Sequence, residues 1–166
     1  SVYVCQNLNS GADKMKNKNI LQMLKPKAMT SYMYDDSTLR QAVEKMKHHG
    51  YTAVPVINRE GEYVSTISEG DFLWFILKHD IHDMTDMEDY LVKDIPSKVT
   101  CLPVSVNSTI EDLLVLSMNQ NFVPVVDDRA VFIGIVTRKD ILQVCFNTLE
   151  EHGLFSAQPE YAADDI

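Results

Sequence analysis

Two short motifs pair a hydroxyl with a carboxylate three residues later: Ser68-Glu69-Gly70-Asp71 and Thr137-Arg138-Lys139-Asp140. Each motif stands where an apolar run, typical of a strand, gives way to an amphipathic helix. A Ser or Thr at that place caps the helix, and the helix dipole stabilises the Asp in the first turn. Such a carboxylate can accept hydrogen bonds from two neighbouring hydroxyls of a sugar, and the free backbone N–H groups suit a phosphate. Spacing alone leaves two alternatives open, a plain helix cap or a site for a phosphorylated sugar.

The two motifs differ in the charge between the hydroxyl and the carboxylate. The second holds Arg138 and Lys139, whereas the first holds Glu69. Arginine binds phosphate through its forked N–H donors, and a glutamate repels it. We therefore expect the Asp140 motif to be the better anion site, although an ordinary solvated helix start would carry the same basic residues.

The motifs belong to a longer internal repeat. Val54-Pro55-Val56-Ile57 matches Val123-Pro124-Val125-Val126 at an offset of 69 residues, and the same offset relates the two motifs. Upstream, Ser37-Thr38-Leu39 matches Ser108-Thr109-Ile110 at an offset of 71. A unit of about 70 residues is too long for a solenoid repeat and indicates a duplicated small domain.

Each copy is predicted to run strand, helix, strand, strand, helix. Strands are expected over 31–34, 54–57 and 63–67, and again over 102–106, 123–126 and 131–136. Apolar stripes from Leu39 and from Ile110 predict the first helix of each copy, capped by Asp36 or Ser37 and by a capping box of Ser108 with Glu111. The second helices begin near Glu69 and Arg138. Phe72, Trp74 and Phe75 are expected to be mostly core residues, and one of the three, with Trp74 as the first candidate, to face a dimer partner.

These elements divide the chain into segments. We expect a leader over 1–17, a first repeat over 18–80, a linker with a short helix around 87–92 over 81–95, a second repeat over 96–148, and an acidic, flexible tail over 149–166. Small residues, Ser65 and Gly134, lie inside the last strand of each copy, where they allow tight packing or leave room for a flat ring. Pro55 and Pro124 imply an unpaired strand edge or a bulge.

Composition limits the partners. The formal net charge is −9 and the isoelectric point about 4.9, so nucleic acid and anionic membranes are disfavoured as partners. Three scattered cysteines fit reduced thiols of a cytoplasmic protein, and the longest apolar run is far shorter than the roughly 20 residues of a membrane span. No metal site is predicted, because the histidines and aspartates of 79–83 stand alone in a polar connector.

The order and spacing of these features resemble the CBS domain, present here as a tandem pair over about residues 20–147. Val123-Pro124-Val125-Val126 followed by Gly134-Ile135-Val136-Thr137-Arg138-Lys139-Asp140 carries the resemblance; the first copy departs from it at Ser65 and Gly70. The chain is similar in particular to stand-alone bacterial CBS-pair proteins. The resemblance implies a mixed α/β fold (α+β or α/β) of two β-α-β-β-α repeats packed pseudo-symmetrically, with two clefts between them and dimeric assembly.

The resemblance also implies roles for individual residues. Asp71 and Asp140 would hold a ribose, while Ser68 and Thr137, with Arg138 and Lys139, would cap the helix and contact phosphate. Adenine would lie against two segments of each copy, namely Thr30, Ser31, Tyr32, Thr52 and Ala53 in the first copy and Cys101, Leu102, Pro103, Asn121 and Phe122 in the second. No cofactor is required, and an adenine nucleotide (AMP, ADP or ATP) is the expected regulatory ligand.

Several functions fit this resemblance. The leading hypothesis is a regulatory, non-enzymatic homodimer that senses adenine nucleotides and acts through an unidentified partner protein. A second hypothesis is a receptor for cyclic di-AMP, to which Val92-Lys93-Asp94-Ile95-Pro96 and Asn121-Phe122-Val123 are similar, although Asp140 favours a ligand with a free ribose. A third is a ligand-free dimeric interaction module, and an enzyme is the weakest alternative. A ligand shifts the packing of the repeats only if it binds one state better than the other.

Overall fold

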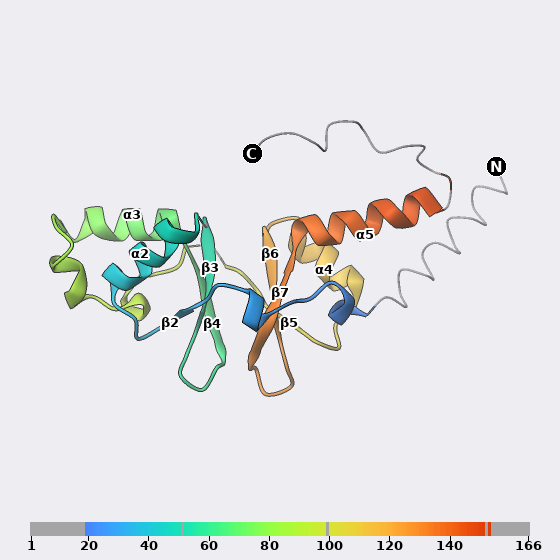
Figure 1. The fold of residues 1–166 in the computed structure, drawn as a ribbon, viewed down its shortest axis with the longest axis horizontal. Coiled ribbons are helices and arrows are strands. Elements are labelled where there is room, and N and C mark those ends of the chain that lie inside the picture. The colour runs from blue at the N-terminus through green and yellow to red at the C-terminus, as the bar shows by residue number, and fades with distance from the viewer. Residues whose placement is uncertain (1–18, 51, 99, 152, 154–166) are drawn as a thin grey trace.

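The computed structural model describes residues 19–50, 52–98, 100–151 and 153 of the 166-residue chain. The described part is a mixed α/β fold with two β-sheets that stand side by side, each with its helices on the outer side (Figure 1). The predicted leader and the part of the predicted tail from residue 154 lie outside the described residues. Helix α5 extends past residue 148, where the tail was expected to begin.

Both repeats show the predicted order of strand, helix, strand, strand and helix. The first comprises β2 Met33–Tyr34, α2 Leu39–His49, β3 Ala53–Ile57, β4 Tyr63–Ser68 and α3 Glu69–Lys78. The second comprises β5 Val104–Ser105, α4 Ile110–Ser117, β6 Phe122–Val126, β7 Phe132–Thr137 and α5 Arg138–Glu151. In each, the first strand runs parallel to the second, and the second and third form an antiparallel hairpin.

The first strand of each repeat is shorter than predicted. Strand β2 pairs only with Val56 and Ile57, and β5 only with Val125 and Val126. Among the described residues, no strand therefore lies beside β3 from Ala53 to Pro55 on the side of β2, which explains how Pro55, with no N–H, is accommodated inside a sheet. A register shift between Val56 and Ile57 adds a bulge next to it.

The caps of α2 and α4 correct the sequence prediction by one residue. Thr38 with Gln41 and Thr109 with Asp112 form the capping boxes, rather than Asp36 or Ser37 and Ser108 with Glu111. The N–H of Ser37 donates to the carbonyl of Tyr34, and the N–H of Ser108 to that of Ser105. Each serine thus closes a turn, and the following threonine is the first residue free to cap.

The described part of the chain also contains four short 3-10 helices: η1 Ile20–Gln22, η2 Lys27–Met29, η3 Asp86–Asp89 and η4 Val92–Asp94. The last two replace the single helix predicted around 87–92. Leu91 bridges Thr38, and the carbonyl of Tyr90 accepts from the N–H of Leu39. This pairing with the start of α2 keeps the chain extended at Tyr90 and Leu91 and interrupts the helix.

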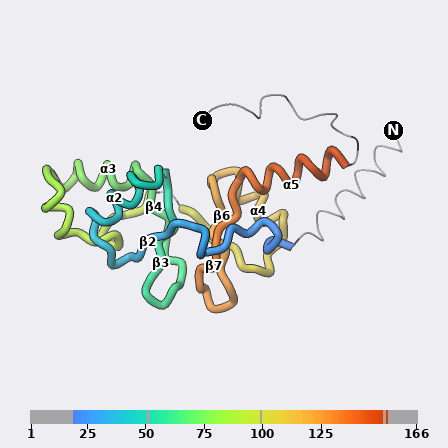
Figure 2. Tube along the Cα trace, in the orientation of Figure 1, coloured from blue at the N-terminus to red at the C-terminus, as the bar shows by residue number. Residues whose placement is uncertain are grey.

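The segment that precedes each repeat packs on the other repeat. Ile20 is buried in the core of the second repeat with Val123 and Ile141, and β1 Lys25–Pro26 pairs antiparallel with β7. Likewise Val92 and Ile95 join the core of the first repeat. The N-terminal segment crosses from one sheet to the other, as the trace in Figure 2 shows. The two repeats are therefore held together by exchanged segments.

The predicted core assignments of α3 are confirmed. Phe72 and Phe75 are buried, while Trp74 is 54% exposed. Among the described residues, no helix combines the length and the apolar character needed to cross a bilayer.

Gly134 permits the contact between β1 and β7. A Cβ built on Gly134 would lie 2.2 Å from the carbonyl oxygen of Lys25 and 3.0 Å from the Cα of Pro26. Such a contact with backbone atoms cannot be relieved by rotating a side chain. The glycine predicted to allow close packing therefore does so, and the approaching chain is β1.

We predict that Gly134→Ala lowers the free energy of unfolding by about 1–3 kcal/mol, the usual effect of overpacking. Hydrogen exchange should also rise across 19–26, because the added methyl group displaces β1. Urea denaturation and amide exchange provide the measurements. Gly70→Ala is the matched control, since a Cβ there finds its nearest atoms at 3.7 and 3.9 Å. Equal stability of the two variants would contradict this account.

Candidate functional site

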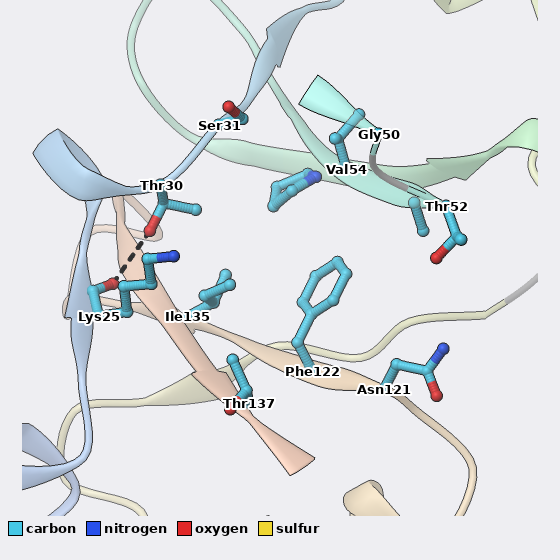
Figure 3. Close-up of a pocket in the computed structure, with 12 residues that line it drawn as sticks. Lys25, Thr30, Ser31, Gly50, Thr52, Val54, Asn121, Phe122, Ile135 and Thr137 are labelled. Carbon is cyan, nitrogen blue, oxygen red and sulfur yellow. Dashed lines mark hydrogen bonds between the residues drawn. The ribbon is translucent and has the colours of Figure 1, made fainter. Parts of the chain in front are cut away.

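A cavity of about 280 Å³ lies between the two repeats and takes its walls from both. Its lining residues are Lys25, Thr30, Ser31, Gly50, Thr52, Ala53, Val54, Pro55, Asn121, Phe122, Ile135 and Thr137 (Figure 3). We call this cavity the first cleft. Thr30, Ser31, Thr52, Ala53, Asn121, Phe122 and Thr137 were predicted site residues, and the fold brings all seven together.

The apolar walls of the first cleft come from Phe122, Ile135 and the β3 edge. The Phe122 ring projects between the two repeats in Figure 3, and Ala53, Val54 and Pro55 line the part of β3 that β2 leaves unpaired. A flat aromatic ligand can stack in such a slot while its polar edge meets backbone groups. Apolar walls with few polar groups are typical of small-molecule sites.

The cation of the first cleft is Lys25, which sequence analysis did not identify. Its ammonium group points toward the cavity in Figure 3, and the hydroxyl of Thr30 donates to the carbonyls of Lys25 at 3.2 Å and Pro26 at 3.0 Å. Lys25 lies upstream of the first predicted strand, and only the pairing of β1 with β7 carries it to the second repeat. A basic residue beside Pro26 is too weak a signal to mark it in advance.

Asp140 lines an open hollow that adjoins the first cleft at Lys25. This open hollow has a volume of about 520 Å³ and is lined by Lys25, Pro26, Asp140 and neighbouring residues. Thr137 caps α5 as predicted, because its Oγ1 accepts from the Asp140 N–H at 3.1 Å and donates to Asp140 Oδ2 at 2.5 Å. Among the described residues, no hydrogen bond to Asp140 Oδ1 is found, so that oxygen is available to a ligand.

Arg138 occupies a different place from the one expected of a phosphate ligand. Its Nε donates to the carbonyls of Ser117 at 2.7 Å and Gln120 at 3.2 Å, at the end of α4. Lys139 is exposed. Neither residue lines the first cleft, so the positive charge facing that cavity comes from Lys25 rather than from the helix start.

A pseudo-symmetric second cleft of about 320 Å³ adjoins the first cleft, with which it shares Thr52, Ala53, Asn121 and Phe122. It is lined by Thr52, Ala53, Thr66, Ser68, Cys101, Asn119, Gln120, Asn121 and Phe122. Asp71, the counterpart of Asp140, is only 4% exposed. Its Oδ2 accepts from the N–H and hydroxyl of Ser68 at 2.9 and 2.7 Å, and its Oδ1 accepts from the Lys98 N–H at 3.0 Å. Both carboxylate oxygens of Asp71 are thus occupied within the protein.

Each cleft keeps the predicted adenine segments of one repeat together but takes its helix cap from the other repeat, which the prediction did not foresee. Thr30 and Ser31 of the first repeat share a cleft with Thr137 of the second, whereas Cys101 of the second shares a cleft with Ser68 of the first. The exchange of the preceding segments causes this crossing.

Three predicted adenine contacts lie elsewhere. Tyr32 is absent from the lining of the first cleft, and its ring packs edge-on against Phe132 and Tyr34 with centroids 6.3 and 5.8 Å away. Leu102 and Pro103 line a separate hollow beside Tyr63 rather than the second cleft. The backbone of Leu102 nevertheless contacts the carboxamide of Gln120, which lines the second cleft.

Tyr63 and Cys101 form a half-buried contact beside the second cleft. The Tyr63 hydroxyl donates to the carbonyl of Cys101 at 2.8 Å and lies 2.9 Å from the Thr66 hydroxyl. Burial raises the pKa of the Tyr63 hydroxyl far above its usual range and also raises the pKa of the Cys101 thiol. Both groups are therefore neutral at pH 7, and this wall of the cleft offers no charge to a ligand.

The comparisons with known proteins agree with the fold. The family model described as "CBS domain" matches residues 29–78 and 92–147. The chain belongs to the CBS-domain family. An uncharacterised protein of Methanocaldococcus jannaschii is 26% identical over 169 residues, which cover 84% of this chain and 96% of that protein.

Two solved structures show the same fold with nucleotides. CbpB in complex with c-di-AMP matches with a TM-score of 0.77 and 22% identity, over 89% of this chain and 97% of that one. CBSX2 in complex with AMP matches with a TM-score of 0.62 and 21% identity, over 79% of this chain and 98% of that one. This chain is a tandem CBS protein with the architecture of both.

The two aspartates should differ in their structural roles. We predict that Asp71→Ala lowers the free energy of unfolding by about 2 kcal/mol, because it removes the buried carboxylate that accepts from the N–H and hydroxyl of Ser68 and from the N–H of Lys98. Asp140→Ala should cost less than about 1 kcal/mol, since Thr137 still caps α5. Urea denaturation of both variants tests this difference. Equal losses would show that the carboxylates are equivalent.

Proposed function

We propose that this CBS pair is a regulatory protein that binds an adenine nucleotide in the first cleft, with the ribose near Asp140 and a phosphate near Lys25. The observation that carries the proposal is the convergence, at the junction of the two repeats, of an apolar slot, the Lys25 ammonium group and a carboxylate oxygen that has no partner among the described residues. CbpB and CBSX2, which share the fold, bind c-di-AMP and AMP.

The chemistry of each wall suits part of such a ligand. Phe122 and Ile135 offer an apolar surface to the base, and Asp140 Oδ1 can accept from ribose hydroxyls. Lys25 lies in both the first cleft and the adjoining hollow, so its ammonium group can reach a phosphate joined to that ribose. The proposal assigns binding to these residues and no bond-breaking step.

A ligand between the repeats can act as a signal because it contacts both of them. Thr30 and Ser31 come from the segment before β2, while Phe122 and Thr137 bound the hairpin of the second repeat. A nucleotide that binds one relative position of these walls more tightly than another shifts the population toward it. The regulated protein would recognise that difference.

A second candidate ligand, c-di-AMP, is favoured by the continuity of the site. The first cleft and the adjoining hollow meet at Lys25, which gives a larger ligand with two phosphates room to extend. Asp140 favours AMP instead, because c-di-AMP has each 3′ oxygen esterified and offers only the 2′ hydroxyl. Binding of AMP should therefore depend more on Asp140, and binding of c-di-AMP more on Lys25.

We predict that Asp140→Ala weakens AMP binding roughly tenfold or more, the effect of losing hydrogen bonds to a charged group. If c-di-AMP is the ligand, Lys25→Ala should cause the larger loss. Titration calorimetry with AMP, ADP, ATP and c-di-AMP distinguishes these outcomes, supported by mass spectrometry of small molecules released from the purified protein. Asp128→Ala, which removes an exposed hairpin carboxylate, is the control. Absence of binding by all four compounds would favour the ligand-free interaction module.

The proposal also retains the expected homodimer. Helix α3 exposes Leu73, Trp74 and Leu77, each at least 51% accessible, and apolar surface of this kind tends to be covered in an assembly. Lys98 lies 5.4 Å from the centre of the Trp74 ring and leaves most of it accessible.

We predict that Trp74→Asp converts a dimer to a monomer, because it places a charge in the centre of the apolar face. Sedimentation equilibrium measures the mass of each form. Met84→Asp, at an exposed methionine in the connector, should leave the dimer intact. A monomeric unaltered protein would remove this part of the proposal.

A further inference from the structure

The side chain of Gln120 lines the second cleft and is fixed there by hydrogen bonds to the backbone. Gln120 is only 5% exposed, although it lies in the loop between α4 and β6. Its Oε1 accepts from the Leu102 N–H at 2.9 Å, and its Nε2 donates to the Leu102 carbonyl at 3.1 Å. The same Nε2 lies 3.3 Å from both the Phe122 carbonyl and the Cys101 sulfur. The carboxamide therefore pairs edge to edge with the backbone of one residue.

This pairing has the hydrogen-bond pattern of adenine. The Watson–Crick edge of adenine places an acceptor, N1, beside a donor, the N6 amino group, and the carboxamide of glutamine places Oε1 beside Nε2 in the same order. A backbone N–H and C=O of one extended residue satisfy either group equally well. Gln120 thus occupies the backbone pair that would recognise an adenine in the second cleft.

The first cleft has the same backbone pair without such an occupant. Met33 pairs with Val56 and Val104 with Val125, so Ser31 and Leu102 occupy equivalent positions two residues before those strands. Ser31 lines the first cleft, and among the described residues no hydrogen bond to its N–H or carbonyl is found. The two clefts therefore differ at this position: the Gln120 side chain occupies the backbone groups of Leu102, whereas the equivalent groups of Ser31 have no hydrogen-bond partner among the described residues.

We propose that Gln120 is an internal competitor for adenine: it closes the second cleft, so that each chain binds one nucleotide, and its removal exposes a second site. The inference builds on the proposed function. The second cleft still has about 320 Å³ of space beside Ser68 and Thr66, so it is the base edge, rather than volume, that is taken. An entering adenine must break two hydrogen bonds at Leu102, which weakens binding there by roughly 10- to 100-fold.

Titration of AMP into the full chain tests this inference. The unaltered protein should bind one AMP per chain, and Gln120→Ala should bind two. Asn147→Ala, which truncates an exposed carboxamide on α5 that pairs with Gln143, should still bind one. Gln120→Met keeps the volume without the hydrogen bonds and should also gain a second site, which guards against a folding defect specific to the alanine variant.

Cys101 supplies a second readout, because its thiol lines the second cleft. Peptide mapping after iodoacetamide treatment should show that AMP protects Cys101 in Gln120→Ala but not in the unaltered protein. One AMP per chain in both Gln120 variants, with no protection of Cys101, would overturn the inference and leave the proposed function standing. In Asp140→Ala combined with Gln120→Ala, binding of one AMP that protects Cys101 supports the second site even if the first cleft binds nothing.

Discussion

The antiparallel contact of β1 with β7 determines the rest of the site. Lys25 lies opposite Ile135 and Pro26 opposite Gly134, so the segment before the first repeat is fixed on the sheet of the second. This contact brings Thr30 and Ser31 to the cavity that Phe122 and Thr137 line. Without it, the Ser31 backbone and the Lys25 ammonium group would have no fixed position relative to Asp140. One glycine, by allowing the backbones to touch, therefore makes a site from parts of both repeats.

Local features of the site were predictable, whereas features that depend on tertiary contacts were not. The caps at Ser68 and Thr137 follow from a hydroxyl three residues before an aspartate at a strand end, and the structure contains both. Lys25 and Gln120 carry no such signal, because their roles arise from chain segments far away in sequence. The crossing of the clefts escaped prediction for the same reason. The duplication indicates which positions are equivalent but not which repeat each wall joins.

Small shifts in the predictions have local causes as well. The caps at Thr38 and Thr109 lie one residue beyond the predicted ones, because a turn ends at each preceding serine. Tyr32 was placed in the cleft by its position beside Ser31, yet alternate residues of an extended segment point in opposite directions. Its ring therefore packs against Phe132, where Lys27 and Lys45 lie 5.0 and 5.4 Å from the ring centre.

Two clefts that arose from one duplicated unit differ here in only a few groups. Tyr63 and Phe132 are equivalent positions, but only Tyr63 has a hydroxyl, and it donates to the carbonyl of Cys101, the counterpart of Thr30. The backbone N–H of Lys98 donates to Oδ1 of Asp71, whereas Oδ1 of Asp140 has no partner among the described residues. Each of these differences satisfies a polar group beside the second cleft, whereas its counterpart beside the first cleft has no such partner among the described residues. Because buried polar groups are costly without partners, the protein satisfies the groups of one cleft itself and leaves those of the other for a ligand.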